Sequence, residues 1–403
     1  MSEVAQRLED LRAAGLDRRL RLVEGPQGPR VTLEGAEVLL LCSNNYLGLA
    51  DHPRVRQAAA AAAERFGAGA GASRLISGNM APHRRLEERI AAFAGYEAAL
   101  LFGSGYLANL GAISSLVGRG QVVFSDELNH ASIIDGCRLS RAERFVYRHA
   151  DLEHLTWGLR QADHRGALIV TDAVFSMEGD VAPIADLVEL ARRHRCRLIV
   201  DEAHATGALG PGGRGAVAEA GLSGEVDVIV GTLGKALGSY GAYVCASGEI
   251  VELLINVARP FIYSTAPPPP AVGAALAALA LLEGQPGLVG QLQRNAALLR
   301  DALAVQGLGV GASRTQIVPV VVGAAASAMA LCERALEGRV FAQAIRPPTV
   351  PEGTSRLRLS VMANHRADDL CAAARVIGRA ARELRLGSAR EEAGVASGLR
   401  RAA

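Results

Sequence analysis

Short, continuous apolar runs alternate with longer segments of helical periodicity along most of this chain, beginning near residue 50. The runs, each three to five residues long, lie at 98–102, 122–124, 167–171, 198–200, 226–230 and 242–245. Helical patterns such as 185–195 lie between most of them. Strands buried on both faces have continuous apolar sequences, and parallel strands need long crossover connections. The alternation therefore predicts an α/β fold with a mainly parallel central sheet covered by helices on both faces.

Different patterns precede and follow this alternation. Residues 3–24 place leucines among arginines at helical spacing, which predicts an amphipathic N-terminal helix ending near residue 25, and an apolar strand follows at 38–42. Prolines at 267–270 precede a long alanine- and leucine-rich helix, beyond which shorter strands occur at 317–322 and 356–361. We predict four parts: an N-terminal helix and strand segment over 1–45, a large domain with the parallel sheet over 46–284, a smaller α+β domain over 285–387 and a disordered tail over 388–403.

The charge balance and hydropathy argue against nucleic-acid and membrane partners. Lys and Arg number 43 against 41 Asp and Glu, which leaves a formal charge of +2 and no strong field for binding polyanions. The longest apolar run, 271–282, is shorter than the roughly 20 residues that a bilayer span needs. The N-terminus has no apolar signal core. We expect a cytoplasmic protein.

The cysteines are scattered and form neither a CxxC pair nor a cluster with histidine. This spacing disfavours structural zinc and a disulfide framework, and we predict no metal site. Most of these thiols are expected to be small core residues in a reducing compartment. They are Cys42, Cys137, Cys196, Cys245, Cys332 and Cys371.

Lys235 follows the apolar run 226–230 in the sequence Gly231-Thr232-Leu233-Gly234-Lys235. Partial burial lowers the pKa of a lysine and makes it a nucleophile toward carbonyls. The alternative is a surface lysine in a loop. A phosphate-binding loop of the Walker A type does not fit, because Ala236 follows the lysine in place of Ser or Thr.

Two further strand ends carry titratable residues. The run 198–200 leads into Asp201-Glu202-Ala203-His204, and His130 lies shortly after the run 122–124. Ligands of open α/β sheets bind at the carboxyl ends of the strands, so Asp201, His204 and His130 are candidates for one pocket. The alternatives are a helix cap for Asp201 and a structural role for His130.

The loop Phe102-Gly103-Ser104-Gly105-Tyr106 joins the run 98–102 to a predicted helix. Glycines and a helix N-terminus together favour phosphate binding. The spacing Gly103-x-Gly105-x-x-Ala108, with Asp126 about twenty residues on, also fits a loose dinucleotide fingerprint. A nicotinamide dehydrogenase is therefore an alternative.

Four strand ends, at Gly105, His130, Asp201 and Lys235, can converge on one cleft. A phosphate cradle, a flat histidine, an aspartate and an imine-forming lysine match the needs of pyridoxal 5′-phosphate (PLP). Nicotinamide chemistry has no need for the pair of Asp201 and Lys235.

Motifs in the same order over nearly the whole chain make it resemble the α-oxoamine synthases, a family of fold-type I PLP-dependent transferases. The matching blocks lie at 44–48, 73–78, 174–180, 201–204, 232–235, 262–265 and 356–360.

The resemblance implies roles for individual residues. Lys235 binds the cofactor covalently and moves protons at the substrate carbon, Asp201 pairs with the pyridine nitrogen, and His130 stacks on the ring. The remaining implied cofactor contacts are His204 and Ser176 on the phenolic-oxygen side, and the Gly105 and Tyr106 backbone with the Thr232 hydroxyl on the phosphate. Family members are homodimers with shared active sites, so Thr265 is expected to reach the phosphate of the neighbouring subunit.

The resemblance also implies substrates. The stretch 344–351 is most similar to family members that condense L-alanine with pimeloyl-CoA or pimeloyl-carrier protein, giving 8-amino-7-oxononanoate, the free thiol and CO₂ in biotin biosynthesis. Thr349 and Arg18 are the implied donor contacts, although Arg19 and Arg21 lie beside Arg18. The other implied substrate residues are Asn44, His130 and Arg356, the last for the amino-acid carboxylate. A sibling enzyme with another acyl donor and amino acid, such as a glycine C-acetyltransferase, is the alternative.

Overall fold

The computed structural model describes residues 2–162 and 165–386. These residues cluster into two compact units. The first contains the described residues of Met1–Asn44, Met177–Gly179 and Gln291–Ala403, and the second contains Asn45–Ser176 and Asp180–Gly290. The domain division predicted above stays a prediction, and its tail over 388–403 lies outside the described residues.

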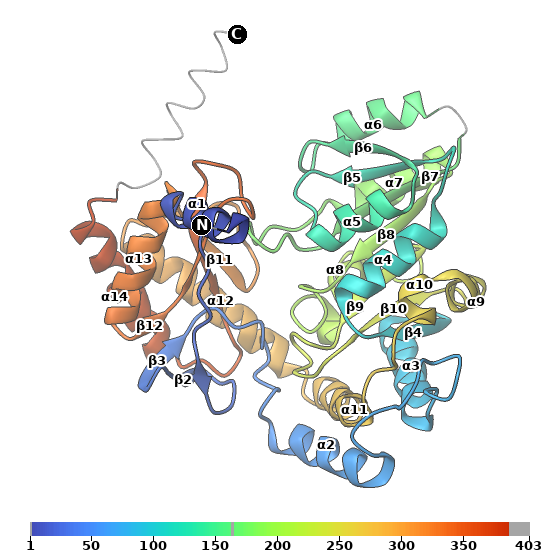
Figure 1. Ribbon diagram of the computed structural model, residues 1–403, viewed down its shortest axis with the longest axis horizontal. Helices are drawn as coiled ribbons and strands as arrows, with labels where there is room; N and C mark the ends of the chain where they lie inside the picture. The colour runs from blue at the N-terminus through green and yellow to red at the C-terminus, as the bar shows by residue number, and fades with distance from the viewer. Residues whose placement is uncertain (1, 163–164, 387–403) are drawn as a thin grey trace. The chain divides into compact units, whose positions relative to one another are not determined.

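A seven-stranded sheet forms the centre of the second unit, in the order β4-β10-β9-β8-β7-β5-β6 (Figure 1). Its strands are β4 (Ala98–Phe102), β5 (Val122–Asp126), β6 (Glu143–Tyr147), β7 (Ala167–Asp172), β8 (Arg197–Asp201), β9 (Val228–Thr232) and β10 (Ala242–Ala246). The ladders from β9 to β6 are parallel, whereas β10 runs antiparallel to both β9 and β4. The predicted, mainly parallel sheet is confirmed.

Helices pack against this sheet in groups. One group, α4 (Gly105–Leu116), α5 (Ala131–Leu139), α9 (Gly248–Val257) and α10 (Arg259–Ile262), is joined through contacts of α4. A second pair, α6 (Leu152–Gln161) and α7 (Ile184–His194), contacts β6 and β8, and α3 (Ala81–Ala94) packs on β4 (Figure 1). The remaining helices are α2 (Pro53–Phe66), α11 (Pro269–Gly284), the short α8 (Ala216–Glu219) and a 3₁₀ turn at Pro211–Gly213.

The core explains why the strands read as continuous apolar runs. Val170, Ile199 and Val230 of three adjacent strands are fully buried and pack in one cluster with Ala108 and Ala112 of α4. Burying a valine or isoleucine side chain contributes about 1.5–3 kcal/mol. The small alanines of α4 let the helix pack closely on the sheet. Its N-terminus lies near the carboxyl end of β4 because only Gly103 and Ser104 separate the two elements.

The first unit has two small sheets. One has the order β1-β2-β3-β12 and the other β11-β14-β13. The strands are β1 (Val23–Glu24), β2 (Arg30–Leu33), β3 (Ala36–Leu40), β11 (Ile317–Gly323), β12 (Val340–Phe341), β13 (Gln343–Ile345) and β14 (Ser355–Ser360). The helices are α1 (Glu3–Ala13), α12 (Gly287–Val305, in this unit from residue 291), α13 (Ala325–Glu337) and α14 (Ala367–Glu383).

The predicted N-terminal helix over 3–24 is wrong in its length. Helix α1 ends at Ala13, and Gly15 adopts a φ of +63°, a conformation that L-residues adopt only at a cost. Beyond it, Val23 and Glu24 form a strand against β2. Most of the leucines that suggested an amphipathic face are exposed, Leu20 at 97%, and Leu16 is half-buried.

Strand β6 was not predicted either. Its sequence Glu143-Arg144-Phe145-Val146-Tyr147 mixes charged and apolar residues because it lies at the edge of the sheet, where it has one neighbour, β5. Across the described residues, no single helix is long and apolar enough to cross a membrane, although α11 and α12 taken together pass that test by length and composition.

Candidate active site

The carboxyl ends of β4, β5, β7, β8 and β9 lie at one edge of the sheet, because these strands all run in the same direction. Asp201 is the last residue of β8, Lys235 and His130 come shortly after β9 and β5, and Gly105 comes shortly after β4. All four lie in the second unit. The structure therefore places the four predicted cofactor residues at one edge of one sheet.

Lys235 and His204 are direct neighbours. The Lys235 Nζ lies 2.8 Å from His204 Nε2, and His204 Nδ1 lies 2.6 Å from the hydroxyl of Tyr46. Tyr46 is completely buried and His204 is 6% exposed. The three groups form a line in which the imidazole joins the lysine amine to a buried phenol.

Asp201 ends β8 and is held by two N–H donors. Its Oδ1 accepts from the backbone of Ala203 at 2.8 Å, and its Oδ2 accepts from Asn109 Nδ2 at 2.6 Å. Hydrogen bonds of this kind favour an ionised carboxylate. Asn109 lies on α4, whose close packing on the sheet brings the amide to this point.

His130 is the N-cap of α5 and lies beside the same network. Its Nδ1 lies 2.7 Å from Ser132 Oγ, and Ser132 Oγ accepts from Asn109 Nδ2 at 2.9 Å. Burial lowers the pKa of His130, and the Lys235 charge adds to this while the Asp201 charge opposes it. The ring is therefore neutral near pH 7 and suited to stacking on a flat cofactor.

Asp172 lies directly beside Asp201 in the register of β7 and β8. Its Oδ2 accepts the backbone N–H of His130 at 2.6 Å. Burial raises the pKa of Asp172 well above its usual value, and the negative charge of Asp201 raises it further. Two buried carboxyl groups this close do not ionise equally easily.

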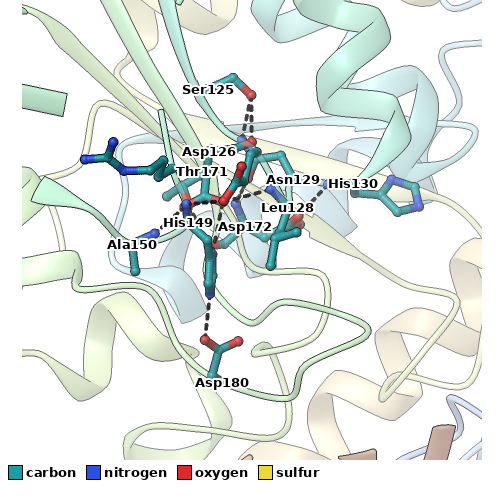
Figure 2. Close-up of polar contacts among 12 residues, drawn as sticks. Ser125, Asp126, Leu128, Asn129, His130, His149, Ala150, Thr171, Asp172 and Asp180 are labelled. Atoms are coloured by element: carbon teal, nitrogen blue, oxygen red, sulfur yellow. Dashed lines mark hydrogen bonds and ion pairs between the residues drawn. The ribbon is translucent and has the colours of Figure 1, made fainter. Parts of the chain in front are cut away.

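Figure 2 shows the residues behind His130, whose ring points away from the cluster. Asn129 Nδ2 donates to Ser125 Oγ and to the Val170 carbonyl, both at 2.9 Å, and its Oδ1 accepts the Asp172 N–H at 2.8 Å. These bonds tie the end of β5 to the end of β7.

Asp126 does not serve a dinucleotide. It is 2% exposed and accepts from His149 Nδ1 at 3.0 Å and from the backbones of Leu128 at 2.9 Å and Ala150 at 2.8 Å (Figure 2). A carboxylate that is buried and already accepts three hydrogen bonds within the protein is not available to a ribose. The dinucleotide reading of Gly103–Ala108 is therefore wrong.

The start of α4 has the features of a phosphate site. Ser104 is the N-cap and its hydroxyl accepts the Leu107 N–H at 3.3 Å, while Gly105 and Tyr106 occupy the first turn. Their N–H groups have no partner within the helix. Thr232 ends β9 and its hydroxyl donates to the Gly241 carbonyl at 3.1 Å.

Ser176 and Thr265 also belong to the second unit. Ser176 follows the buried segment 173–175, which is closed by a bridge between Val174 and Val181. Thr265 pairs with Ser73 in an isolated β-bridge.

The predicted donor residues Arg18 and Thr349 line one pocket of about 690 Å³ in the first unit. Arg19 pairs with Glu34 at 2.8 Å, and Arg21 contacts Glu34 and Glu333. Within the described part of the chain, Arg18 has no acidic partner. Ion pairing thus distinguishes Arg18 from its sequence neighbours Arg19 and Arg21, both of which are paired with glutamates.

Arg356 and Asn44 are engaged within the first unit. Arg356 is 6% exposed and its Nη1 lies 2.9 Å from Glu178 Oε1 and 3.1 Å from the Met177 carbonyl. Asn44 Oδ1 accepts from Arg358 at 3.3 Å. A substrate carboxylate at Arg356 would compete with Glu178.

The sequence did not point to Tyr46, Asn109, Ser132 or Asp172 as site residues. Asp172 ends a buried strand as Asp201 does, so this position could have been found. Asn109 lies inside a helix and no local pattern marks it.

All six cysteines are free thiols. Cys137, Cys245 and Cys332 are buried, whereas Cys42, Cys196 and Cys371 are half-buried, so the prediction that most of the thiols lie in the core holds for three of the six. In the regions that the structure describes, no group of three or more His, Cys, Asp or Glu side chains could hold a metal ion.

The donor set fits PLP. A carboxylate at Asp201, held by two N–H donors, can bind a protonated ring nitrogen. Lys235 is half-buried beside His204, and the α4 N-terminus offers N–H groups to a phosphate. The flat, neutral His130 completes the set.

Comparison with known proteins agrees with this assignment. The family description "Aminotransferase class I and II" matches residues 36–377. A curated 8-amino-7-oxononanoate synthase from Geobacter sulfurreducens is 55% identical over 94% of this chain and 98% of its own.

Solved structures give the same picture. A serine palmitoyltransferase from S. paucimobilis, with PLP and myriocin bound, has a TM-score of 0.90 at 32% identity, covering 94% of this chain and 97% of its own. An 8-amino-7-oxononanoate synthase from Francisella tularensis has a TM-score of 0.75 at 30% identity, covering 86% and 98%. The chain therefore belongs to the aminotransferase class I and II family, has the fold of its PLP-dependent α-oxoamine synthases, and uses pyridoxal 5′-phosphate as its cofactor.

Proposed function

We propose that this chain catalyses the decarboxylating condensation of L-alanine with a pimeloyl thioester, yielding 8-amino-7-oxononanoate, the free thiol and CO₂, as a step of biotin biosynthesis in the cytoplasm. The observation that carries the proposal is the 55% identity, over 94% of the chain, with a protein named 8-amino-7-oxononanoate synthase. The thiol carrier is either coenzyme A or a carrier protein.

PLP, when bound, supplies an electron sink that stabilises negative charge on the alanine Cα. Asp201 holds the proton on the ring nitrogen, which its two N–H donors support by favouring the ionised carboxylate. His130 would stack on the ring, and the N–H groups of Gly105 and Tyr106, with the Thr232 hydroxyl, would hold the phosphate.

Lys235 removes the proton from the alanine Cα and later returns one to the product carbon. A lysine acts as a base only when it is neutral, and His204 at 2.8 Å can accept or donate the proton that Lys235 gains or loses. His204 and Ser176 also contact the phenolic-oxygen side of the cofactor.

The two substrates carry carboxylates that need cationic partners. Arg356 binds the carboxylate of alanine, displacing Glu178, because a planar guanidinium holds a carboxylate through two parallel hydrogen bonds. Asn44, next to Arg358, contacts the same substrate. Arg18 binds the anionic donor and Thr349 its polar groups, which is supported by the pocket that they share and by the absence of an acidic partner for Arg18 in the described residues.

The active form is a homodimer in which Thr265 contacts the phosphate held by the neighbouring subunit. Large apolar side chains near Thr265 and its bridge partner Ser73 are exposed, among them Ile76 at 80% and Tyr263 at 71%. Exposed apolar patches of this kind mark protein–protein interfaces.

The first experiment tests the cofactor lysine and the substrates together. Borohydride reduction should attach PLP covalently to the peptide that contains Lys235, and Lys235→Ala should abolish turnover with the fold retained. A panel of pimeloyl, acetyl and palmitoyl donors against alanine, glycine and serine should select pimeloyl and alanine. A preference for acetyl- or palmitoyl-CoA would leave a sibling α-oxoamine synthase.

The second experiment tests the donor pocket. Arg18→Ala and Thr349→Val should raise the KM for the pimeloyl donor by about ten- to a hundredfold, the range for losing a hydrogen bond to a charged group. The Kd for alanine, read from cofactor absorbance, should stay unchanged. Arg19→Ala is the matched control, because Arg19 is paired with Glu34. Equal weakening of donor and alanine would contradict the assignment.

A further inference from the structure

Two buried carboxyl groups compete for one negative charge at the carboxyl edge of the sheet. Asp172 and Asp201 are direct partners in the register of β7 and β8, and they are 3% and 4% exposed. Side by side in a low-dielectric site, they cannot both ionise easily. The cofactor requires the charge on Asp201.

The hydrogen bonds that each carboxyl receives differ by one side-chain donor. Asp172 Oδ2 accepts the His130 N–H at 2.6 Å, whereas Asp201 accepts both the Ala203 N–H at 2.8 Å and Asn109 Nδ2 at 2.6 Å. The other charged groups that act on Asp172 are Lys235 and Asp126. Asn109 therefore adds the donor that distinguishes the two aspartates.

The second amide hydrogen of Asn109 connects this residue to His130 through the hydroxyl of Ser132. Asn109 Nδ2 donates to Ser132 Oγ at 2.9 Å, and His130 Nδ1 lies 2.7 Å from that oxygen and accepts the Ser132 backbone N–H at 3.3 Å. Since Nδ1 accepts the backbone N–H, the Ser132 hydroxyl also donates to it. His130 thus carries its proton on Nε2.

The Asn109 side chain donates both of its amide hydrogens, whereas its carbonyl oxygen accepts no hydrogen bond among the described residues. Asn109 is 1% exposed, and its Oδ1 has no hydrogen-bond partner among the described residues. A buried acceptor without a donor is costly. The surroundings of Asn109 therefore favour its role as a donor of two hydrogen bonds over a role as an acceptor.

We propose that Asn109 is a positioning residue that directs the negative charge to Asp201 in preference to Asp172 and, through Ser132, keeps His130 in one neutral tautomer. The inference rests on PLP as the cofactor and on the role of Asp201 in the proposed function. It does not depend on the acyl donor.

The test measures the ring-nitrogen protonation of PLP in the holoenzyme by ¹⁵N NMR with labelled cofactor, between pH 6 and 9. We expect a protonated nitrogen throughout this range in the parent protein. Asn109→Ala and the similarly sized Asn109→Leu should lose that protonation within the range and bind PLP about ten- to a hundredfold more weakly. Circular dichroism of the apoproteins shows whether each variant folds, and Asn109→Leu stands in if Asn109→Ala does not.

A second substitution separates charge placement from simple packing. Asp172→Asn in the Asn109→Ala background removes the competing carboxyl and should restore ring-nitrogen protonation, which repair of a cavity would not do. Ser132→Ala should leave the ring nitrogen protonated and change the ¹⁵N tautomer signature of His130.

Unchanged protonation and PLP affinity in both Asn109 variants, or no rescue by Asp172→Asn, would overturn the inference. A parent protein that protonates the ring nitrogen and yet makes no oxononanoate would reject the proposed donor while leaving this inference standing.

Discussion

At the scale of single residues, the chemistry of this site depends on which group holds each proton. Lys235, His204 and Tyr46 are linked by contacts of 2.8 and 2.6 Å, so a proton that leaves the substrate carbon has a defined place to go. In the proposed function, Asp201 supplies the negative charge that pairs with the ring nitrogen of the cofactor. Loss of the proton-transfer contacts and loss of the Asp201 charge should therefore have different effects on the reaction.

Asp201→Asn keeps the size of the side chain and removes its charge. Without the carboxylate the ring nitrogen loses its proton, so exchange of the alanine Cα hydrogen should slow by several powers of ten, with about 1.4 kcal/mol of barrier for each factor of ten. The measurement is Cα–H exchange into deuterated water, followed by NMR. Near-normal exchange would contradict the assigned role of Asp201.

Tyr46→Phe removes the hydroxyl that lies 2.6 Å from His204 Nδ1. The imidazole then loses one of the contacts that restrain its tautomer and orientation. The pH dependence of kcat should therefore shift and kcat should fall roughly tenfold, less than general acid–base assistance as a whole contributes. Tyr243→Phe is the matched control, because it removes a buried hydroxyl that contacts Thr206 at 3.0 Å. Identical pH profiles for Tyr46→Phe and the parent would exclude this role.

At the scale of elements, the loops after β8 and β9 have to lie against each other for His204 to meet Lys235. Gly207 makes this approach possible: its φ is +78°, and a Cβ there would lie 2.5 Å from the Cβ of Ala236. Any larger residue would push the two loops apart.

Gly207→Ala should therefore lower both stability and PLP affinity. Gly212→Ala is the control, because Gly212 also has a positive φ, +62°, but open space where the Cβ would be. The control should cost about 1–2 kcal/mol from the left-handed backbone alone, and Gly207→Ala should cost more. Thermal unfolding and PLP titration measure the two effects. Equal losses in both variants, with PLP affinity retained, would show that the contact with Ala236 is unimportant.

At the scale of the whole molecule, the free energy of unfolding should depend on pH through the protonation of one histidine. His149 lies between Asp126 at 3.0 Å and Asp180 at 2.8 Å (Figure 2). Burial alone would lower the pKa of His149, but hydrogen bonds to the two carboxylates outweigh it and raise the pKa to about 10. The folded protein thus keeps a proton that the unfolded chain releases near pH 6.5.

This proton sets the sign of a pH effect on stability. The stabilisation is fully present below about pH 6.5, where both states are protonated, and it is lost as pH rises toward 10, by up to about 1.4 kcal/mol per pH unit. Urea unfolding of the PLP-bound protein at pH 6 to 9 should show this decline, and His149→Asn should reduce it. His154→Asn, whose ring accepts the Arg148 N–H, should leave it unchanged. A decline of equal slope in His149→Asn would refute the effect.

The local sequence was sufficient for the large sheet and for much of the cofactor site. Continuous apolar runs marked β4, β5, β7, β8, β9 and β10 because these strands are buried on both faces. Lys235, Asp201, His130 and Gly105 could be predicted because each lies at the carboxyl end of such a strand or a few residues beyond it. The carboxyl ends of parallel strands necessarily meet at one edge of the sheet.

Tertiary structure decided which side chains touch these residues. Asn109 lies on a helix 92 positions before Asp201, and Tyr46 lies 158 positions before His204, so no local pattern could pair them. Helix α1 ended early because one glycine turned left-handed, and β6 escaped prediction because an edge strand needs no apolar pattern. Sequence periodicity reports the burial of an element, whereas contacts between distant elements depend on how the helices pack on the sheet.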